Sequence, residues 1–256
     1  MRITAIANSK GGTTKTTTAV NLAAAAALAG HRVLLVDLDK QGSATQWLEH
    51  SPDTDDLLRV LLSGTSLDEI TAPTAVKGLE LVPASAALAQ TGRLTAEVGH
   101  QFLLRNCLAR TPARDWVFID SPGDLGAATI MALTAAREVL VPIPAGSMEL
   151  DELPKVLETI EKVRDRLNPD LRLAGVLLTK FKTVGRHARV LSRDVAAELR
   201  SGLPDHLMQT VVREDDRHGE APAWHKPMAV YDPGGRGDQD YRAVLDELMG
   251  REVVGA

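Results

Sequence analysis

The sequence predicts an α/β protein with a doubly wound, mainly parallel sheet flanked by helices. Apolar runs of strand length alternate with helical patterns along the whole chain. The first two runs are joined by one helix, as in a βαβ unit. Glycine-rich or acidic segments follow the ends of several runs. Ligands of such sheets bind at the carboxyl ends of the strands, so the functional residues are expected there.

Length and composition bound the rest of the interpretation. The chain has 256 residues, 44% of them hydrophobic, and no repeat, linker or low-complexity tract divides it, so we expect a single domain over residues 1–256. The net charge of -5 means that any contact with nucleic acid has to come from a local basic face. The single Cys107 excludes an internal disulfide and a cysteine metal cluster, which indicates a cytosolic protein.

The amino-terminal residues do not resemble a targeting segment. The apolar run after Arg2 is only five residues long before Asn8 and Ser9 turn polar. No apolar segment approaches the roughly 20 residues that cross a bilayer. Because the sequence starts directly with its first strand, we expect no amino-terminal helix-turn-helix domain.

Each element is predicted from its hydrophobic period. Apolar runs predict strands, and those at 32–36 and 116–119 are each followed directly by an aspartate. The strands are expected at residues 3–7, 32–36, 79–82, 116–119, 138–142, 171–179 and 207–212. Helical spacing predicts helices at residues 17–29, 55–62, 84–94, 100–110, 150–167, 188–200 and 238–249.

Residues 9–16, SKGGTTKT, connect the first strand to the first helix. The glycine pair lets the backbone close on a phosphate, Lys15 suits the β- and γ-phosphates, and Thr16 suits Mg²⁺. The helix start adds a positive dipole end. A glycine turn with surface lysines is the plainer alternative, because Ser9 and Thr14 stand where the general P-loop pattern has glycine. The predicted nucleotide contacts are Lys10, Gly11, Gly12, Thr13, Thr14, Lys15, Thr16 and Thr17.

Carboxylates follow two of the predicted strands. Asp37 and Asp39 come after the second strand, and Asp120 ends the strand at 116–119. An Asp-x-Asp pair is more commonly a solvated turn, but here it lies beside the predicted phosphate loop. A buried strand that ends in Asp120 can fix a carboxylate that reaches Mg²⁺ through water.

The extra Lys10 before the glycines makes the loop similar to a known signature. Residues 10–16 resemble K-G-G-x-x-K-S/T, the deviant Walker A motif of the ParA/MinD family of P-loop ATPases. Residues 37–41 resemble the family's D-x-D-P-Q segment, and residues 120–123 resemble its D-x-P-P segment. Glu220-Ala221-Pro222 and Lys226-Pro227 resemble later segments, so the likeness spans nearly the whole chain.

The resemblance implies a Mg²⁺-dependent ATPase and assigns roles. Lys10, Lys15 and Asp39 would be catalytic, with Asp39 orienting the attacking water. Thr16, Asp37 and Asp120 would serve the metal. In relatives two subunits pair on ATP and the residue at Lys10 reaches the partner's nucleotide, which implies an ATP-dependent homodimer. A solvated Lys10 is the alternative.

Four positions depart from the family pattern. Most relatives carry glycine at Thr14, and a β-branched side chain there can crowd the phosphate, which raises the hypothesis of a slow ATPase. If Thr14 is helical, only its methyl and hydroxyl groups need space. Lys40 and Gly123 replace prolines, and Arg213 replaces proline near the expected adenine position. In relatives the base lies near the loops after the strands that end here at Thr179 and Val212.

Basic residues gather in the carboxyl-terminal half, although the chain is acidic overall. They are Lys180, Lys182, Arg186, Arg189, Arg193, Arg213, Arg217 and Arg236. Any single one of these residues is more simply explained as a solvated surface residue, whereas relatives bind DNA through a patch of this kind. The predicted DNA contacts are Lys182, Arg186, Arg189, Arg213 and Arg217, through sequence-independent and salt-sensitive phosphate binding.

The resemblance therefore implies a partition ATPase of the short ParA type, cytoplasmic and nucleoid-associated. It would bind non-specific DNA and be stimulated by a ParB-like centromere-binding protein to move a plasmid or chromosome. A positioning ATPase for a protein cargo is an alternative. A MinD-like membrane-cycling ATPase would need a basic amphipathic carboxyl-terminal helix, and Asp246, Glu247 and Glu252 make this end too acidic, so no membrane partner is expected. A metabolic P-loop ligase or amidase is a third class.

Overall fold

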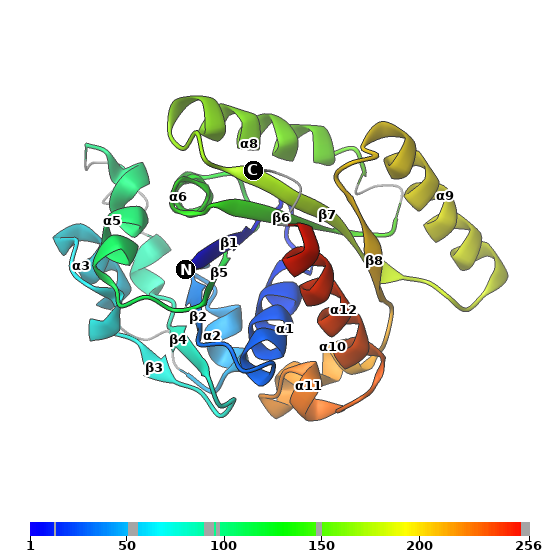
Figure 1. Cartoon of the computed structure of the whole chain (residues 1–256), viewed down its shortest axis with the longest axis horizontal. Coiled ribbons are helices and arrows are strands. Elements are labelled where there is room, and N and C mark those ends of the chain that lie inside the picture. The colour runs from blue at the N-terminus through cyan, green and yellow to red at the C-terminus, as the bar shows by residue number, and fades with distance from the viewer. Residues whose placement is uncertain (13, 51–55, 90–94, 96–97, 147–149, 252–256) are drawn as a thin grey trace.

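The computed structural model describes residues 1–12, 14–50, 56–89, 95, 98–146 and 150–251. Eight strands form one sheet in the order β3-β4-β2-β5-β1-β6-β7-β8, and every pair is parallel except β3 with β4 (Figure 1). The strands are β1 (Arg2–Ile6), β2 (Val33–Asp37), β3 (Ala72–Pro73), β4 (Leu79–Val82), β5 (Trp116–Asp120), β6 (Glu138–Pro144), β7 (Arg172–Phe181) and β8 (Leu207–Arg213). The predicted fold class is confirmed.

Helices cover both faces of this sheet. Figure 1 shows α1 and α12 on one face and α6 and α8 on the other. The α-helices are α1 (Lys15–Leu28), α2 (Ser43–Trp47), α3 (Asp56–Ser63), α5 (Leu103–Arg110), α6 (Ala127–Ala135), α8 (Leu153–Arg166), α9 (Arg186–Gly202), α10 (Arg217–Glu220), α11 (Met228–Tyr231) and α12 (Arg236–Gly250). Short 3₁₀ helices are η1 (Leu67–Glu69), η2 (Ala86–Ala89), η3 (His100–Phe102) and η4 (Ala221–Trp224).

The continuous apolar strands fill two separate cores. Successive side chains of a strand point to opposite faces. In β5, Trp116 and Phe118 pack with α1 and α12, whereas Val117 and Ile119 pack on the other face with α5, α6 and α8. A strand that is buried on both faces therefore reads as one unbroken apolar run.

Two predictions about helices need correction. The prediction of a helix over residues 84–94 is wrong for residues 84–89, where only η2 forms. Residues 90–94 lie outside the described residues. Helix α6 was not predicted, because its sequence AATIMALTA is almost entirely apolar and shows no amphipathic period. No helix among the described residues is long and apolar enough to cross a membrane.

Helix α12 closes the edge of the sheet at β8. The Glu247 carboxylate accepts hydrogen bonds from the backbone N–H groups of Gln209 and Thr210, each at 2.8 Å. Asp240, which lies about two turns earlier in α12, accepts a hydrogen bond at 2.8 Å from the N–H of Arg213. Burial opposes ionisation of Glu247, but these bonds and Arg251 hold its pKa below the ordinary value. The helix thus covers backbone donors that an edge strand otherwise exposes.

Removing the Glu247 carboxylate should destabilise this edge. We expect Glu247→Ala to lower the free energy of unfolding by about 2 kcal/mol, because two backbone donors lose a charged acceptor. Glu158→Ala is the matched control, since Glu158 forms an exposed helical ion pair with Lys162, which solvent screens and which therefore contributes little to stability. Urea denaturation of both variants measures the difference, and equal losses would contradict the assignment.

Candidate functional site

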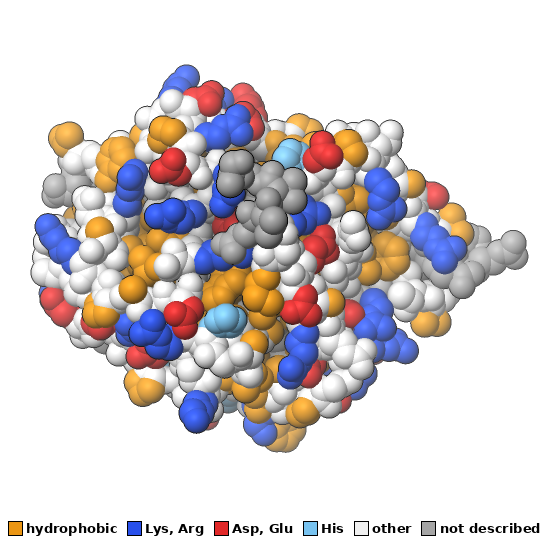
Figure 2. Space-filling view, in the orientation of Figure 1, with side chains coloured by type: hydrophobic (Ala, Val, Ile, Leu, Met, Phe, Trp, Pro, Cys, Tyr) orange, Lys and Arg blue, Asp and Glu red, His pale blue; other side chains and the backbone are white. Residues whose placement is uncertain are grey.

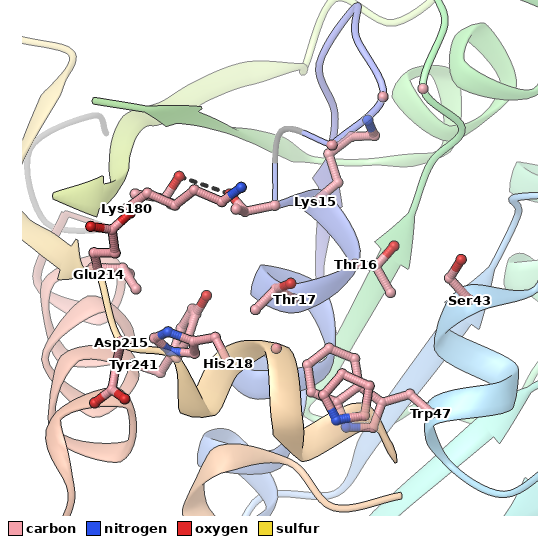
Figure 3. A pocket seen from close by; sticks show the side chains of 18 of the residues that line it. Lys15, Thr16, Thr17, Ser43, Trp47, Lys180, Glu214, Asp215, His218 and Tyr241 are labelled. Atoms are coloured by element: carbon pink, nitrogen blue, oxygen red, sulfur yellow. Dashed lines mark hydrogen bonds between the residues drawn. The ribbon is translucent and has the colours of Figure 1, made fainter. Parts of the chain in front are cut away.

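A cavity of about 670 Å³ opens at the carboxyl ends of the strands (Figure 3). Its walls come from the loop after β1, the start of α1, the segment after β2 and the segments after β7 and β8. The lining residues include Gly11, Gly12, Thr14, Lys15, Thr16, Thr17, Asp39, Ser43, Trp47, Gly123, Thr179, Lys180, Val212, Glu214, Asp215, Asp216, His218 and Tyr241. The structure therefore brings the predicted phosphate loop and the ends of β7 and β8 into one space.

The phosphate loop is anchored at its base and packed against a second loop. Asn8 donates from Nδ2 to the Pro142 carbonyl at 2.7 Å and accepts from the Ser9 N–H at 2.7 Å. Gly12 has φ of +76°, as predicted for the glycine pair, whereas Gly11 is not among the residues with positive φ. A Cβ on Gly123 would lie 3.0 Å from the Gly11 Cα. Glycine at 123 thus allows the loop after β5 to approach the phosphate loop closely.

Two predicted contacts in this loop need comment. Thr13 lies outside the described residues. Thr14 is left-handed, with φ 63° and ψ 18°, so the condition that it be helical is not met. Helix α1 starts one residue later, at Lys15. A left-handed conformation costs little for glycine and more for threonine, which gives a physical reason for glycine at this position in relatives.

Lys15 lies beneath the loop and Lys10 at its surface. The Lys15 side chain is 6% exposed, and its Nζ donates to the Lys10 carbonyl oxygen at 2.8 Å. Burial lowers the pKa of Lys15, while the nearby charges of Asp120, Asp39 and Asp124 act against that shift. Lys10 itself is exposed to solvent. The two lysines of the motif therefore occupy different environments, because Lys15 is buried and lines the cavity whereas Lys10 is exposed.

Asp37 organises the segment after β2. It is fully buried, and its Oδ2 accepts from the N–H and the hydroxyl of Thr45 at 2.8 and 2.7 Å. Its Oδ1 accepts from the Asp39 N–H at 3.1 Å. Burial raises the pKa of Asp37 to about 6. Asp37 thus holds both α2 and the backbone of Asp39, whose own carboxylate lines the cavity and accepts from the Gln41 N–H at 2.9 Å.

Asp120 is a carboxylate without a hydrogen-bond partner among the described residues. It is paired in register with Asp37 across β2 and β5, is fully buried, and neither of its oxygens accepts a hydrogen bond from that part of the chain. Burial, followed by the charge of Asp37, raises its pKa well above the ordinary value, against the influence of the Thr16 hydroxyl and Lys15. A buried polar group without a partner is costly.

The donor set fits a magnesium ion. Mg²⁺ takes oxygen ligands and is commonly held by one or two carboxylates together with water and substrate phosphates. The Thr16 hydroxyl lines the cavity and acts on the buried Asp120 carboxylate, so these two groups would supply such oxygens. In the described part of the chain no group of three or more His, Cys, Asp or Glu side chains could hold a metal ion. The residues present therefore suit an ion that is completed by phosphate and water.

The far end of the cavity holds side chains that the sequence did not single out. Figure 3 shows His218, Tyr241, Asp215 and Glu214 opposite Thr16 and Ser43. Burial lowers the pKa of His218, so its ring is neutral at pH 7. The loops after β7 and β8 were expected to lie near the base. Their individual residues carry no motif, and only the packing of α10 and α12 identifies them.

The predicted DNA contacts fall into three groups. Arg213 donates to Asp240 from Nη2 at 2.7 Å and from Nε at 2.9 Å, and Arg217 bonds Asp215 and Asp232. Lys182 has a 45% exposed side chain 3.8 Å from Glu214. The side chains of Arg186 and Arg189 lie outside the described part. Figure 2 shows basic and acidic side chains intermixed on the face it presents.

Asp120 provides a test of the site that needs no assay of activity. We expect Asp120→Asn to raise the free energy of unfolding of the ligand-free protein by about 1–3 kcal/mol at pH 7.5, because burial opposes ionisation of this carboxyl and an amide does not carry that penalty. The gain should shrink at pH 5, since a carboxyl with a raised pKa destabilises the fold progressively as pH rises above its unfolded value. Asp39→Asn is the control, and equal responses of the two variants would contradict the role given to Asp120.

Comparison with known proteins gives a consistent result. Residues 1–173 match the family model of an AAA domain. The chain is 37% identical over 258 residues to the chromosome partitioning protein ParA of Myxococcus xanthus, covering 98% of this chain and 89% of that protein. It is 39% identical over 251 residues to the chromosome-partitioning ATPase Soj of Thermus thermophilus, covering 98% and 96%.

A solved structure matches over the full length. The structure is that of cobyrinic acid a,c-diamide synthase from Mycobacterium smegmatis with bound ADP and magnesium. Its sequence is 31% identical to this chain and the TM-score is 0.85. The match covers 100% of this chain and 96% of that one. Sequence identity, coverage and the phosphate-loop geometry agree. The chain belongs to the ParA/Soj family of P-loop ATPases.

Proposed function

We propose that residues 1–256 form one ParA-like domain that binds ATP with Mg²⁺, hydrolyses it, and uses the cycle to partition DNA. The observation that carries this proposal is the buried Asp120 carboxylate, which has no hydrogen-bond partner in the described part of the chain and lies beside Thr16 and Lys15. Bound Mg²⁺ would neutralise charge on the phosphate oxygens. Lys15 would hold the phosphates, and Thr16 and Asp120 the ion. Asp37 was also predicted to serve the metal, but its oxygens already accept bonds from Thr45 and the Asp39 N–H, so we assign it to fixing the segment from which Asp39 orients water.

Lys10 supports a dimer as the active form. Its backbone carbonyl accepts from Lys15, while the residue is exposed and directly precedes Gly11, which lines the cavity. An exposed lysine next to the phosphate loop can reach the phosphates of a second copy placed face to face, where it would stabilise charge on the transferring group as an arginine finger does. ATP would then promote pairing, and hydrolysis would reverse it.

The decisive experiment measures the mass of the protein with a non-hydrolysable ATP analogue and Mg²⁺. We expect a dimer for the natural sequence, and a monomer with about 100-fold lower turnover for Lys10→Ala, because one charge on the transition state is lost. Lys77→Ala removes an exposed lysine near β4, far from the cavity, and should behave as the natural sequence does. A natural protein that remains monomeric, or unchanged turnover of Lys10→Ala, would refute the dimer.

We propose that the dimer binds DNA non-specifically, and that a ParB-like centromere-binding protein stimulates its ATP hydrolysis. The described cations that remain exposed near the end of β7 include Lys182 and, on α9, Arg193. Arg213 and Arg217 are already bonded to carboxylates, so we assign the phosphate contacts first to the exposed cations and to α9. Binding of this kind depends on the number of phosphates neutralised and not on base sequence.

Charge reversal on this surface should weaken DNA binding. For Lys182→Glu combined with Arg193→Glu we expect at least about tenfold weaker binding of the ATP-bound protein to duplex DNA and a shallower salt dependence, because released counterions follow the phosphate contacts. Lys155→Glu with Lys162→Glu reverses two charges on α8 and is the matched control. Fluorescence anisotropy at several salt concentrations measures the DNA affinity of both double variants. Equal losses of affinity would contradict the assignment of DNA binding to this surface.

One other function is favoured by a specific observation. The similar Mycobacterium smegmatis protein is named as a diamide synthase, and an amide-forming enzyme would use the same phosphate loop to activate a carboxylic acid. Stimulation of ATP hydrolysis by DNA with a ParB-like protein, against stimulation by a small carboxylic acid, separates the two functions. A membrane-cycling function is less well supported, because the apolar residues Tyr241, Val244 and Leu248 of α12 are buried in the core.

A further inference from the structure

Among the described residues that line the cavity, two other than glycine have a left-handed backbone. Thr14 has φ 63°, and Lys180 has φ 48°. This conformation is unfavourable for residues with a Cβ, and especially for a β-branched one such as threonine. Such residues persist where surrounding contacts hold them, and they cluster at ligand sites. The contacts that hold Thr14 are therefore of functional interest.

A hydrogen bond joins Thr14 to the neighbour of Lys180. The hydroxyl oxygens of Thr14 and Thr179 are 2.8 Å apart, although the residues are 165 positions apart in the sequence. The bond connects the phosphate loop to β7, and both residues line the cavity.

Thr179 is the rigid member of this pair. It is 1% exposed, lies in register with Pro144 of β6, and its carbonyl accepts from the Ala145 N–H at 2.8 Å. Two residues later, the Phe181 carbonyl accepts from the Glu214 N–H at 3.0 Å. Strand β7 is thus fixed on both sides around Thr179, so its hydroxyl occupies a defined position.

Thr14 directly precedes α1. Its carbonyl accepts from the Thr18 N–H at 2.8 Å, the first bond of the helix. The N–H groups at a helix start are the ones that bind phosphate. If Thr14 leaves the left-handed conformation, this bond and the direction of those N–H groups change together.

We infer that Thr179 is a positioning residue for the phosphate loop, and that its hydroxyl holds Thr14 in the conformation that directs the start of α1 toward a phosphate. The inference rests on the proposed binding of ATP. Glycine adopts the left-handed conformation without strain, so a chain with glycine at 14 has no need of this bond. Thr179 thus compensates, through a tertiary contact, for the threonine at position 14.

A double-mutant cycle tests the inference through affinity for ADP with Mg²⁺, measured by calorimetry. We expect Thr179→Val to weaken binding about three- to tenfold, the range for one neutral hydrogen bond. Thr14→Gly should bind at least as tightly as the natural protein. Thr14→Gly with Thr179→Val should match Thr14→Gly within about twofold, because the two sites act through one contact.

Thr134→Val is the control for loss of a buried hydroxyl. Thr134 is 1% exposed and donates to the Ile130 carbonyl at 2.7 Å on α6, away from the cavity. It should lower the melting temperature without changing the affinity. Thr179→Val that binds as the natural protein does, or that loses the same affinity in the Thr14→Gly background, would overturn the inference. Absence of ADP binding by the natural protein would instead overturn the proposed function, and this positioning role with it.

Discussion

The register between β2 and β5 places Asp37 directly beside Asp120 at the ends of two buried strands. Burial removes the hydration of both carboxylates and raises the pKa of each, and the charge of Asp37 raises the pKa of Asp120 further. Among the described residues the fold satisfies only Asp37, through Thr45 and the Asp39 backbone, and leaves Asp120 without a hydrogen bond. The cavity reaches Thr16 at the start of α1, whose hydroxyl acts on the buried Asp120 carboxylate. A buried carboxylate without a partner is costly to the ligand-free fold, and under the proposed function a bound cation would offset that cost.

Ion pairs also distinguish the arginines that are bonded to carboxylates of the fold from those that remain available to a ligand. Asp240 and Glu247 of α12 turn toward β8, where they satisfy the donors of an edge strand and the guanidinium of Arg213. Arg217 is likewise engaged by Asp215 and Asp232. A charged side chain that is already paired offers less to an incoming phosphate than an exposed one, since the existing bonds have to be broken first. Position in the sequence alone does not distinguish these two classes of arginine.

The phosphate loop shows how a departure from a family pattern is accommodated. Threonine at 14 adopts the backbone conformation that suits glycine, and a hydroxyl from β7 contacts it. Glycine at 123, in turn, lets the loop after β5 pack within contact distance of Gly11. The loop thus depends on the neighbouring strands for its shape more than a glycine-rich loop would, because its own residues have fewer unstrained conformations.

The sequence by itself determined the fold class, seven of the strands and the position of the phosphate loop, because hydrophobic period and glycine spacing are local properties. It also placed Asp37 and Asp120 at strand ends. It missed α6, whose apolar sequence has no period, and misjudged residues 84–89. Which of the two carboxylates is hydrogen-bonded, which arginines are engaged, and that Thr179 meets Thr14 were decided only by the tertiary structure. These properties depend on contacts between residues that are distant in the chain, and a local sequence pattern does not predict such contacts.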